Sequence, residues 1–423
     1  MIESGAAARA FLTSLFEAAV KAAHPALAVP AHLPPRPAGR TIVVGAGKAS
    51  AQMARAFEAA WDGPLSGAVV TRYGYGCACE RIAVREAAHP VPDAAGLAAA
   101  RHLSGLVAEA RPEDLVVALI SGGGSALLPA PPPGLTLADE VALNDALLRS
   151  GAPIGAMNVL RKHVSTVKGG RLAALSAAPV ASLIVSDIPG DAAHLVASGP
   201  TVPDPASRAE ALRVAADYRL DLPAAVMSHL ATPAADAPRP DDPRFARHSH
   251  RIVASAGLSL AAAAAAAERQ GLAAVILSDA IEGEAHDIAL MHAAMAREVA
   301  ARGRPFRPPV VLLSGGETTV TLGGGGGRGG RNGEFLLALA LALDGVPGVD
   351  ALAADTDGID GSESNAGAFA DGGTAAALRG AGLDPRALLL GHDSYAAFAR
   401  IGALFETGPT GTNVNDFRAI LVR

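Results

Sequence analysis

Two glycine-containing turns each follow a predicted buried strand, and both could bind a phosphate group. The turn Gly45-Ala-Gly-Lys-Ala-Ser50 carries Lys48 where the strand gives way to a helix. The other turn consists of Ser121, Gly122, Gly123, Gly124 and Ser125. Glycines let backbone N–H groups turn toward an anion, and a following helix adds its positive end. We interpret the second turn as a phosphate cradle, with a plain tight turn as the alternative.

The segment around Lys48 departs from two common nucleotide-binding motifs. It lacks the four-residue spacer of the Walker P-loop. It is also an imperfect dinucleotide fingerprint, because Ser50 replaces the third glycine and Arg72 stands where an acid is expected. Lys48 could still place a point charge on a phosphoryl group, and a solvated surface lysine is the alternative.

Carboxylates follow further predicted strands. Asp187 and Asp191 belong to Ser186-Asp-Ile-Pro-Gly-Asp191, and Asp355 opens Asp355-Thr-Asp-Gly-Ile-Asp360. Such loops suit a magnesium ion that keeps most of its waters, and ordinary turns are the alternative. Glu317 adds one more carboxylate, after Ser314-Gly-Gly.

Two basic segments could bind anionic groups. Residues 323–330 are nearly all glycine, and we expect them to form a mobile loop that lets Arg331 close over a phosphate. The second segment could bind a carboxylate, although a solvated basic helix face would have the same composition. It contains Arg161, Lys162, Lys168 and Arg171.

Short apolar runs stop abruptly at Gly, Ser or Asp and alternate with helix-like segments along the chain. Runs of this kind are typical of strands buried on both faces, so we predict an α/β fold with largely parallel sheets. Ligands of such sheets bind beyond the carboxyl ends of the strands, where the polar turns lie. The predicted strands are residues 41–44, 115–120, 183–185, 275–277 and 310–313.

The chain of 423 residues is long enough for two domains. Two strand endings occur twice, and residues 231–250 have the composition of a linker, so we place a boundary near residue 240. The expected domains are residues 1–240 and 241–423.

Composition excludes several classes of function. A net charge of −6 without long basic runs disfavours nucleic-acid binding. The longest uncharged stretch, residues 115–138, contains three glycines in a row and several prolines, so we expect no membrane span and a cytoplasmic protein. The chain also lacks the G-x-S-x-G elbow of α/β-hydrolases.

Taken in order, the motifs resemble those of the class II glycerate kinases, the MOFRL-type glycerate 2-kinases, some of which are labelled hydroxypyruvate reductases. Each motif alone is weak, but the ordered set spans nearly the whole chain. In the first half the matching segments are Val44-Gly-Ala-Gly-Lys48, His89-Pro-Val-Pro-Asp93, Ser121-Gly-Gly-Gly-Ser125, Arg161-Lys-His163, Ser186-Asp-Ile-Pro-Gly-Asp191 and Ala197-Ser-Gly-Pro-Thr201. In the second half they are Ser314-Gly-Gly-Glu-Thr-Thr319, Gly329-Gly-Arg-Asn332, Thr356-Asp-Gly-Ile-Asp-Gly361 and Thr407-Gly-Pro-Thr-Gly-Thr-Asn-Val-Asn-Asp416.

The resemblance implies transfer of the γ-phosphoryl group of ATP to the 2-hydroxyl of D-glycerate, with Mg²⁺, in a cleft between a Rossmann-like N-terminal domain and a MOFRL-type domain. The family's important lysine and arginine fall on Lys48 and Arg331. The expected binding residues are Gly45, Gly47, residues 121–125, Arg161, Lys168, Glu317, Asn332 and Asn413, and the expected metal ligands are Asp187, Asp191 and Asp355. Tyr75 and Gly333 depart from the family pattern, where a histidine and a glutamine are usual.

Two other functions remain open from the sequence. An NAD(P)H-dependent hydroxypyruvate reductase would bind pyrophosphate at the turn around Lys48 and a 2′-phosphate at Arg72. A non-catalytic sugar-phosphate or nucleotide sensor would use the same anion cradles without turnover. For the kinase, we expect ATP and D-glycerate as the only partners of a monomer or homodimer, without nucleic acid or membrane.

Overall fold

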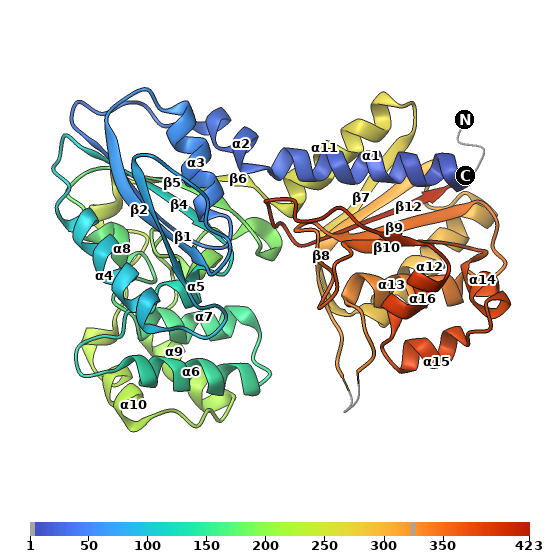
Figure 1. Cartoon of the computed structure of the whole chain (residues 1–423). Helices are drawn as coiled ribbons and strands as arrows, with labels where there is room; N and C mark the ends of the chain where they lie inside the picture. The colour runs from blue at the N-terminus through green and yellow to red at the C-terminus, as the bar shows by residue number, and fades with distance from the viewer. Residues whose placement is uncertain (1–4, 323–325) are drawn as a thin grey trace. The chain divides into compact units, whose positions relative to one another are not determined.

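The computed structural model of the chain describes residues 5–322 and 326–423, which form two compact units (Figure 1). One unit is Pro25–Val253, and the other combines the segment up to His24 with Ala254–Arg423. The expected boundary near residue 240 therefore falls short of the observed one. The expected domains, residues 1–240 and 241–423, stay a prediction, but the helix Gly5–Ala23 packs with the unit that contains Ala254–Arg423.

The unit Pro25–Val253 is built on a six-stranded sheet with the order β3-β2-β1-β4-β5-β6. Strands β1 to β5 pair in parallel, as the apolar runs predicted. Three neighbouring strands, β1, β4 and β5, are buried along their whole length. The strands are β1 (Thr41–Ala46), β2 (Leu65–Arg72), β3 (Ile82–Ala87), β4 (Leu115–Ser121), β5 (Val180–Val185) and β6 (Ser249–Ala254).

Helices of this unit pack on the sheet and also pack with one another beside it. Helices α4 and α5 pack on the sheet around Ile42, Val70 and Ile120, whereas α6, α7, α9 and α10 share a second core around Leu143 and Leu160. The helices are α2 (Pro25–Ala28), α3 (Ser50–Ala60), α4 (Ala94–Ala108), α5 (Gly124–Leu127), α6 (Leu137–Arg149), α7 (Ile154–His163), α8 (Arg171–Ala174), α9 (Arg208–Asp217) and α10 (Ala224–Leu230). Short 3₁₀ turns are η1 (Pro30–His32), η2 (Pro189–Asp191), η3 (Val196–Ser198), η4 (Pro233–Ala235) and η5 (Pro243–Phe245).

The second unit also has a six-stranded sheet, with the order β11-β10-β9-β12-β8-β7. Only the β7–β8 pairing is parallel among the described strands, and the pairings of β8, β9, β10, β11 and β12 with one another are antiparallel. The expectation of a largely parallel second sheet is wrong, because β12 lies between β8 and β9 in the opposite direction and β10 is antiparallel to both β9 and β11. The strands are β7 (Ala273–Glu284), β8 (Val310–Thr319), β9 (Val349–Asp355), β10 (Gly367–Asp371), β11 (Leu404–Phe405) and β12 (Asp416–Val422).

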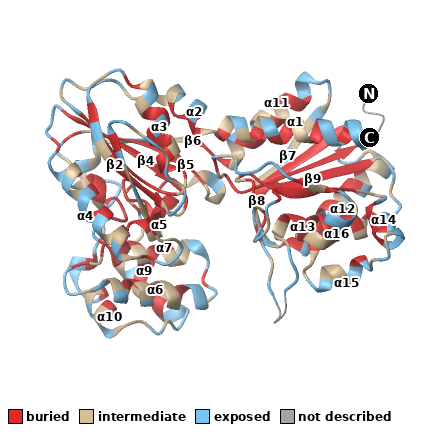
Figure 2. Ribbon diagram, viewed as in Figure 1, coloured by how far each residue is buried: buried red, intermediate tan, exposed pale blue. Residues whose placement is uncertain are grey.

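Helices cover both faces of the second sheet, and its central strands are buried throughout (Figure 2). Helices α1 and α11 pack on the face around Val311 and Phe417, and α12 and α13 pack on the face around Leu312 and Ile420. The helices are α1 (Gly5–Ala23), α11 (Ala256–Arg269), α12 (Ala285–Arg302), α13 (Arg331–Ala342), α14 (Thr374–Gly380), α15 (Pro385–Leu390) and α16 (Ser394–Arg400).

The amphipathic pattern of α1 explains why the start of the chain belongs to the second unit. Its buried side chains recur every three or four residues and include Phe11, Leu12, Leu15 and Phe16. Phe16 meets the rings of Phe405 and Phe417 edge-on at centroid distances of 5.1 and 5.7 Å. Burial of this apolar face stabilises the C-terminal sheet rather than the sheet next in sequence.

No helix in the described ranges is long and apolar enough to cross a membrane.

Candidate active site

Within the unit Pro25–Val253, the carboxyl ends of β1 and β4 bring the two predicted turns into direct contact. Strand β1 pairs in register with β4, so both turns emerge at the same edge of the sheet. The Lys48 N–H donates to the Gly122 carbonyl at 2.8 Å, and the Ala49 N–H donates to Ser121 Oγ at 3.0 Å. The lysine is thereby fixed beside the glycine turn by backbone geometry.

Three side chains surround the glycine turn. Gly123 has a φ of +78°, and a Cβ there would lie 3.0 Å from His89 Nε2 and 3.2 Å from Lys48 Cγ. A Cβ on Gly122 would overlap the Asp187 carboxylate. The turn therefore requires glycine at both positions, and it lies between Lys48, His89 and Asp187.

His89, which the sequence analysis named only within the family motif His89-Pro-Val-Pro-Asp93, belongs to this cluster. Burial, together with the charges of Lys48 and Arg72, lowers the pKa of His89 to about 4. The ring is therefore neutral at pH 7 and can donate or accept one hydrogen bond without adding charge.

Several predicted ligand contacts at this edge prove to be packing contacts. Gly45 and Gly47 are buried, and a Cβ on either would collide with β4 backbone or with Ser121. The Ser121 side chain is buried under the Lys48 turn. Helix α5 contains only four residues, so the predicted helix dipole behind the cradle is weak. An anion at this edge would therefore be bound by Lys48 and by backbone N–H groups.

The predicted basic segment is mostly structural. The Lys162 ammonium is fully buried and paired with Asp204, and burial lowers the pKa of Lys162 to about 7. Lys168 is also buried and paired with Glu140, so its predicted role in substrate binding stays a prediction that the observed contacts do not support. The Arg171 guanidinium donates to four backbone carbonyls, those of residues 162, 168, 235 and 236. Only Arg161, in the last turn of α7, stays partly exposed without such partners among the described residues.

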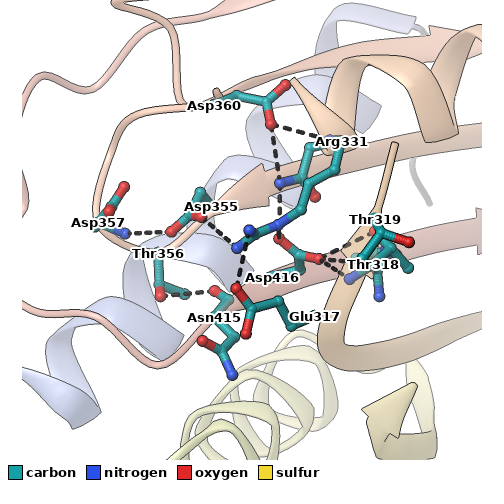
Figure 3. Close-up of polar contacts among 12 residues, drawn as sticks. Glu317, Thr318, Thr319, Arg331, Asp355, Thr356, Asp357, Asp360, Asn415 and Asp416 are labelled. Carbon is teal, nitrogen blue, oxygen red and sulfur yellow. Dashed lines mark hydrogen bonds and ion pairs between the residues drawn. The ribbon is translucent and has the colours of Figure 1, made fainter. Parts of the chain in front are cut away.

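In the other unit, Arg331 is the first residue of α13, and three carboxylates surround it (Figure 3). Its Nη1 lies 3.1 Å from Glu317, its Nη2 lies 2.8 Å from Asp355 and its Nε lies 2.7 Å from Asp416. The Arg331 side chain as a whole is 25% exposed. These carboxylates raise the pKa of Arg331, against the effect of burial.

Asp416 connects Arg331 to a second arginine that the sequence analysis missed. Its Oδ1 accepts from Arg331 Nε and, at 2.9 Å, from Asn332 Nδ2, while its Oδ2 accepts from Arg418 Nη2 and from the Thr318 N–H at 3.2 Å. Arg418 is fully buried in the middle of β12. The Arg418 and Arg331 charges hold the pKa of Asp416 below its usual range.

Asp360 holds the start of α13 in place. Its carboxylate accepts from the N–H groups of Asn332 and Gly333 at 3.0 and 2.8 Å, which satisfies donors that the helix leaves unpaired. Burial raises the pKa of Asp360 to about 6. Arg331 is therefore fixed at the helix end by Asp360 and at its guanidinium by Asp416.

Three predicted site residues of this unit have structural contacts, and their predicted roles stay predictions. Asp355, expected to bind metal, is buried and held by Arg331 and by the Asp357 N–H at 3.0 Å. Burial and the neighbouring Asp357 charge raise the pKa of Asp355. Asn332, expected to contact ligand, is fully buried between Asp360 and Asp416. Asn413 is partly buried, and its Oδ1 accepts from the Asn415 N–H at 3.0 Å.

The glycine tract before Arg331 is more ordered than its composition suggested. Residues 323–325 lie outside the described residues. The Gly327 N–H donates to the Gly391 carbonyl at 2.8 Å, and Arg328 pairs with Glu363 and stacks over Tyr395 at 4.4 Å. Residues 327 and 328 of the expected mobile loop therefore have specific contacts within this unit.

No cluster of three or more His, Cys, Asp or Glu side chains forms a metal site in residues 5–322 and 326–423. Among the predicted metal ligands, Asp187 is partly exposed beside the glycine turn, and Asp191 is partly exposed in the turn η2. Magnesium bound with a nucleotide needs only one or two carboxylates, because phosphate oxygens and water complete its shell. Asp187 fits that requirement.

Known proteins resemble the chain over nearly its full length. A model for a domain of unknown function, DUF4147, matches residues 11–231, and the MOFRL family model matches residues 310–416. A protein of Agrobacterium vitis named "Putative hydroxypyruvate reductase" is 50% identical over 98% of this chain and 94% of its own length. The "Glycerate 2-kinase" of Pyrococcus horikoshii is 42% identical over 91% of this chain and 88% of its own. The crystal structure of a glycerate kinase from Thermotoga maritima superposes with a TM-score of 0.89 at 35% identity, covering 98% of this chain and 99% of that one.

Proposed function

The chain belongs to the glycerate kinase family with a MOFRL domain, and from that premise we propose that it is a glycerate 2-kinase. It would transfer the γ-phosphoryl group of ATP to the 2-hydroxyl of D-glycerate, giving 2-phospho-D-glycerate and ADP. The observation that carries the proposal is the contact of Lys48 with the glycine turn at the carboxyl edge of the first sheet.

That edge supplies what phosphoryl transfer requires. The reaction needs positioning and positive charge more than a nucleophilic side chain. Lys48 is partly exposed and fixed by its own backbone, so its ammonium can bind a phosphate without a large loss of order. His89 is neutral, so it does not compete with Lys48 for the anion.

We assign the metal–nucleotide contact to Asp187. The carboxylate adjoins Gly122, and it is partly exposed, unlike Asp355. Mg²⁺ would enter with ATP and supply charge neutralisation of the phosphates. Arg331, whose side chain is partly exposed, would contribute positive charge.

A hydroxypyruvate reductase is the second candidate, because the Agrobacterium vitis relative carries that name. The geometry of the turn around Lys48 does not favour the reductase. Gly45 and Gly47 pack against β4 instead of lining an open turn, and Arg72 stacks over Tyr75 at 4.5 Å.

One experiment compares both activities. Purified protein is given D-glycerate, ATP and MgCl₂, with ADP measured by chromatography and the product's position assigned by phosphorus NMR. A parallel sample receives hydroxypyruvate with NADH or NADPH and is followed by nicotinamide absorbance. We expect ADP in equal amount to 2-phosphoglycerate, and nicotinamide oxidation without ADP release would refute the kinase.

A further inference from the structure

Arg161 differs from the other basic residues of its segment because neutral groups hold it. Its Nε donates to Asn144 Oδ1 at 2.8 Å, and its Nη1 donates to Asn158 Oδ1 at 3.4 Å. No carboxylate pairs with it in the part of the chain that the structure describes. Glu140, whose charge acts on Arg161, is already bound by Lys168 and by the Ala130 N–H at 3.0 Å. The positive charge of Arg161 is therefore available to an anionic ligand.

A chain of hydrogen bonds leads from Arg161 to the glycine turn. Asn158 Oδ1 also accepts from Ser198 Oγ at 2.9 Å, and Ser198 Oγ lies 2.9 Å from Ser125 Oγ. Asn158 and Ser198 are 2% and 1% exposed, whereas Arg161 and Ser125 at the two ends are partly exposed. A ligand in solvent can reach both ends but not the middle.

Proton counting fixes the direction of these hydrogen bonds. An arginine can only donate, so the Asn158 atom facing Arg161 must be the oxygen, which can only accept. Ser198 has a single hydroxyl proton and donates it to Asn158. The Ser125 hydroxyl must then donate to Ser198, which leaves Ser125 Oγ with lone pairs alone for a ligand.

We propose that Arg161 and Ser125 form the subsite that recognises a small hydroxy acid, with Arg161 binding its carboxylate and Ser125 Oγ accepting a hydrogen bond from its hydroxyl. The proposal rests on the glycerate 2-kinase function and names the groups of the substrate that this unit recognises. An isolated phosphate would use the arginine but offers no hydroxyl donor when fully ionised. A polyol would offer hydroxyls but no anion.

The backbone around Ser198 supports a functional reading. Ala197, Ser198 and Gly199 have φ values of +52°, +59° and +60°, a left-handed conformation that side-chain-bearing residues rarely adopt. The Ser198 and Gly199 carbonyls accept from the N–H groups of Gly169 and Gly170 at 3.0 and 2.7 Å. These bonds hold an unfavourable turn that presents Ser198 to both Ser125 and Asn158, as is common at binding sites.

The test uses three variants and one control. Arg161→Gln removes the charge, Ser125→Ala removes the acceptor, and Asn158→Asp keeps the acceptor oxygen but places a competing carboxylate against Arg161. The control, Arg149→Gln, removes a charge from the exposed end of α6. Steady-state kinetics with D-glycerate and ATP varied separately are combined with calorimetric titration of D-glycerate, without nucleotide, into each folded protein.

We expect the D-glycerate KM and Kd to rise about 10- to 100-fold in Arg161→Gln, as for loss of one charged hydrogen bond. Asn158→Asp should also raise the KM and Kd for D-glycerate, and Ser125→Ala should raise them about tenfold. The ATP KM should stay within about twofold of wild type, and the control should match wild type throughout. Glycerol, which lacks the carboxylate, should bind wild type weakly, and its affinity should not fall further in Arg161→Gln.

Unchanged D-glycerate binding in both Arg161→Gln and Asn158→Asp would overturn the subsite. Equal weakening of D-glycerate and ATP would also overturn it, because the residues would then act on the fold alone. The proposed function fails separately, if wild type forms no ADP with D-glycerate. In that case the calorimetric comparison of wild type and variants still decides whether Arg161 and Ser125 bind a hydroxy acid.

Discussion

Replacing Asp416 with asparagine should destabilise the C-terminal unit far more than the same change at Glu317. Both carboxylates contact Arg331, but the Asp416 side chain is fully buried whereas that of Glu317 is 51% exposed. Asp416→Asn keeps the shape and turns one acceptor into an NH₂ group. In either orientation of the new amide, its NH₂ group would face hydrogen-bond donors. At the Oδ1 position these are Arg331 Nε and Asn332 Nδ2, and at the Oδ2 position they are Arg418 Nη2 and the Thr318 N–H.

The size of the stability loss depends on Arg418, which stays buried after its carboxylate partner is removed. Arg418 is fully buried, and Asp416 is the carboxylate that its guanidinium contacts among the described residues. Removing one partner of a buried ion pair lowers the free energy of unfolding by about 3–5 kcal/mol, because the other charge stays buried. The exposed contact of Glu317 is worth below about 1 kcal/mol.

The assay is urea unfolding of wild type, Asp416→Asn and Glu317→Gln, followed by far-ultraviolet circular dichroism. Trp61, the only tryptophan, lies in the other unit, so its fluorescence does not report on this cluster directly. If Asp416→Asn unfolds within about 1 kcal/mol of Glu317→Gln, the buried bridge contributes no more than the exposed contact, and the reasoning is refuted.

Four further outcomes are expected. Lys48→Met should lower kcat by about 100-fold or more at unchanged melting temperature, with the exposed Lys21→Met as control, and near-normal turnover would remove Lys48 from the mechanism. Arg331→Gln should lower kcat by about 1,000-fold and change either KM by less than about tenfold, as separate saturation curves would show. The pKa of Asp360 is raised to about 6 from 3.8, so the fold binds its proton more tightly than the unfolded chain does. Stability relative to Asp360→Asn should therefore fall by about 3 kcal/mol as pH rises from about 4 to about 6, and a constant difference across urea titrations in that window would contradict the raised pKa. Excess chelator should abolish ADP formation and added Mg²⁺ should restore it, whereas full activity in chelator would exclude a metal–nucleotide substrate.

The sequence predicted the strands with continuous apolar runs, because such runs need burial on both faces and little else explains them. Strands β1, β4, β5 and β8 appear where they were expected. Strand direction could not be predicted in the second half, since a strand covered on both faces has the same composition whether its neighbours are parallel or antiparallel. Strand β12 was missed because Arg418 interrupts its apolar pattern, and contacts with Asp416, Thr318 and the Phe335 ring make that arginine tolerable.

At the site, the sequence succeeded where local geometry decides the outcome. Turns after neighbouring parallel strands share an edge, so the approach of Lys48 to the glycine turn followed from their positions. The sequence could not reveal contacts between residues distant in sequence. The ion pair of Lys168 with Glu140 in the interior is one such contact, and the enclosure of Asn332 by Asp360 and Asp416 is another.

The two arginines proposed to meet substrate differ in a way that separates their roles. Arg331 already contacts three carboxylates, so an anion that approaches it must displace Glu317 or Asp355 and gains little net attraction in the ground state. Arg161 is held by two amide oxygens, so a carboxylate ligand adds an attraction that is missing without it. Binding energy that is present in the ground state lowers KM, and charge stabilisation that grows as phosphoryl transfer proceeds raises kcat. The surroundings of each guanidinium therefore support our proposal that Arg161 recognises the acid and that Arg331 stabilises the transition state.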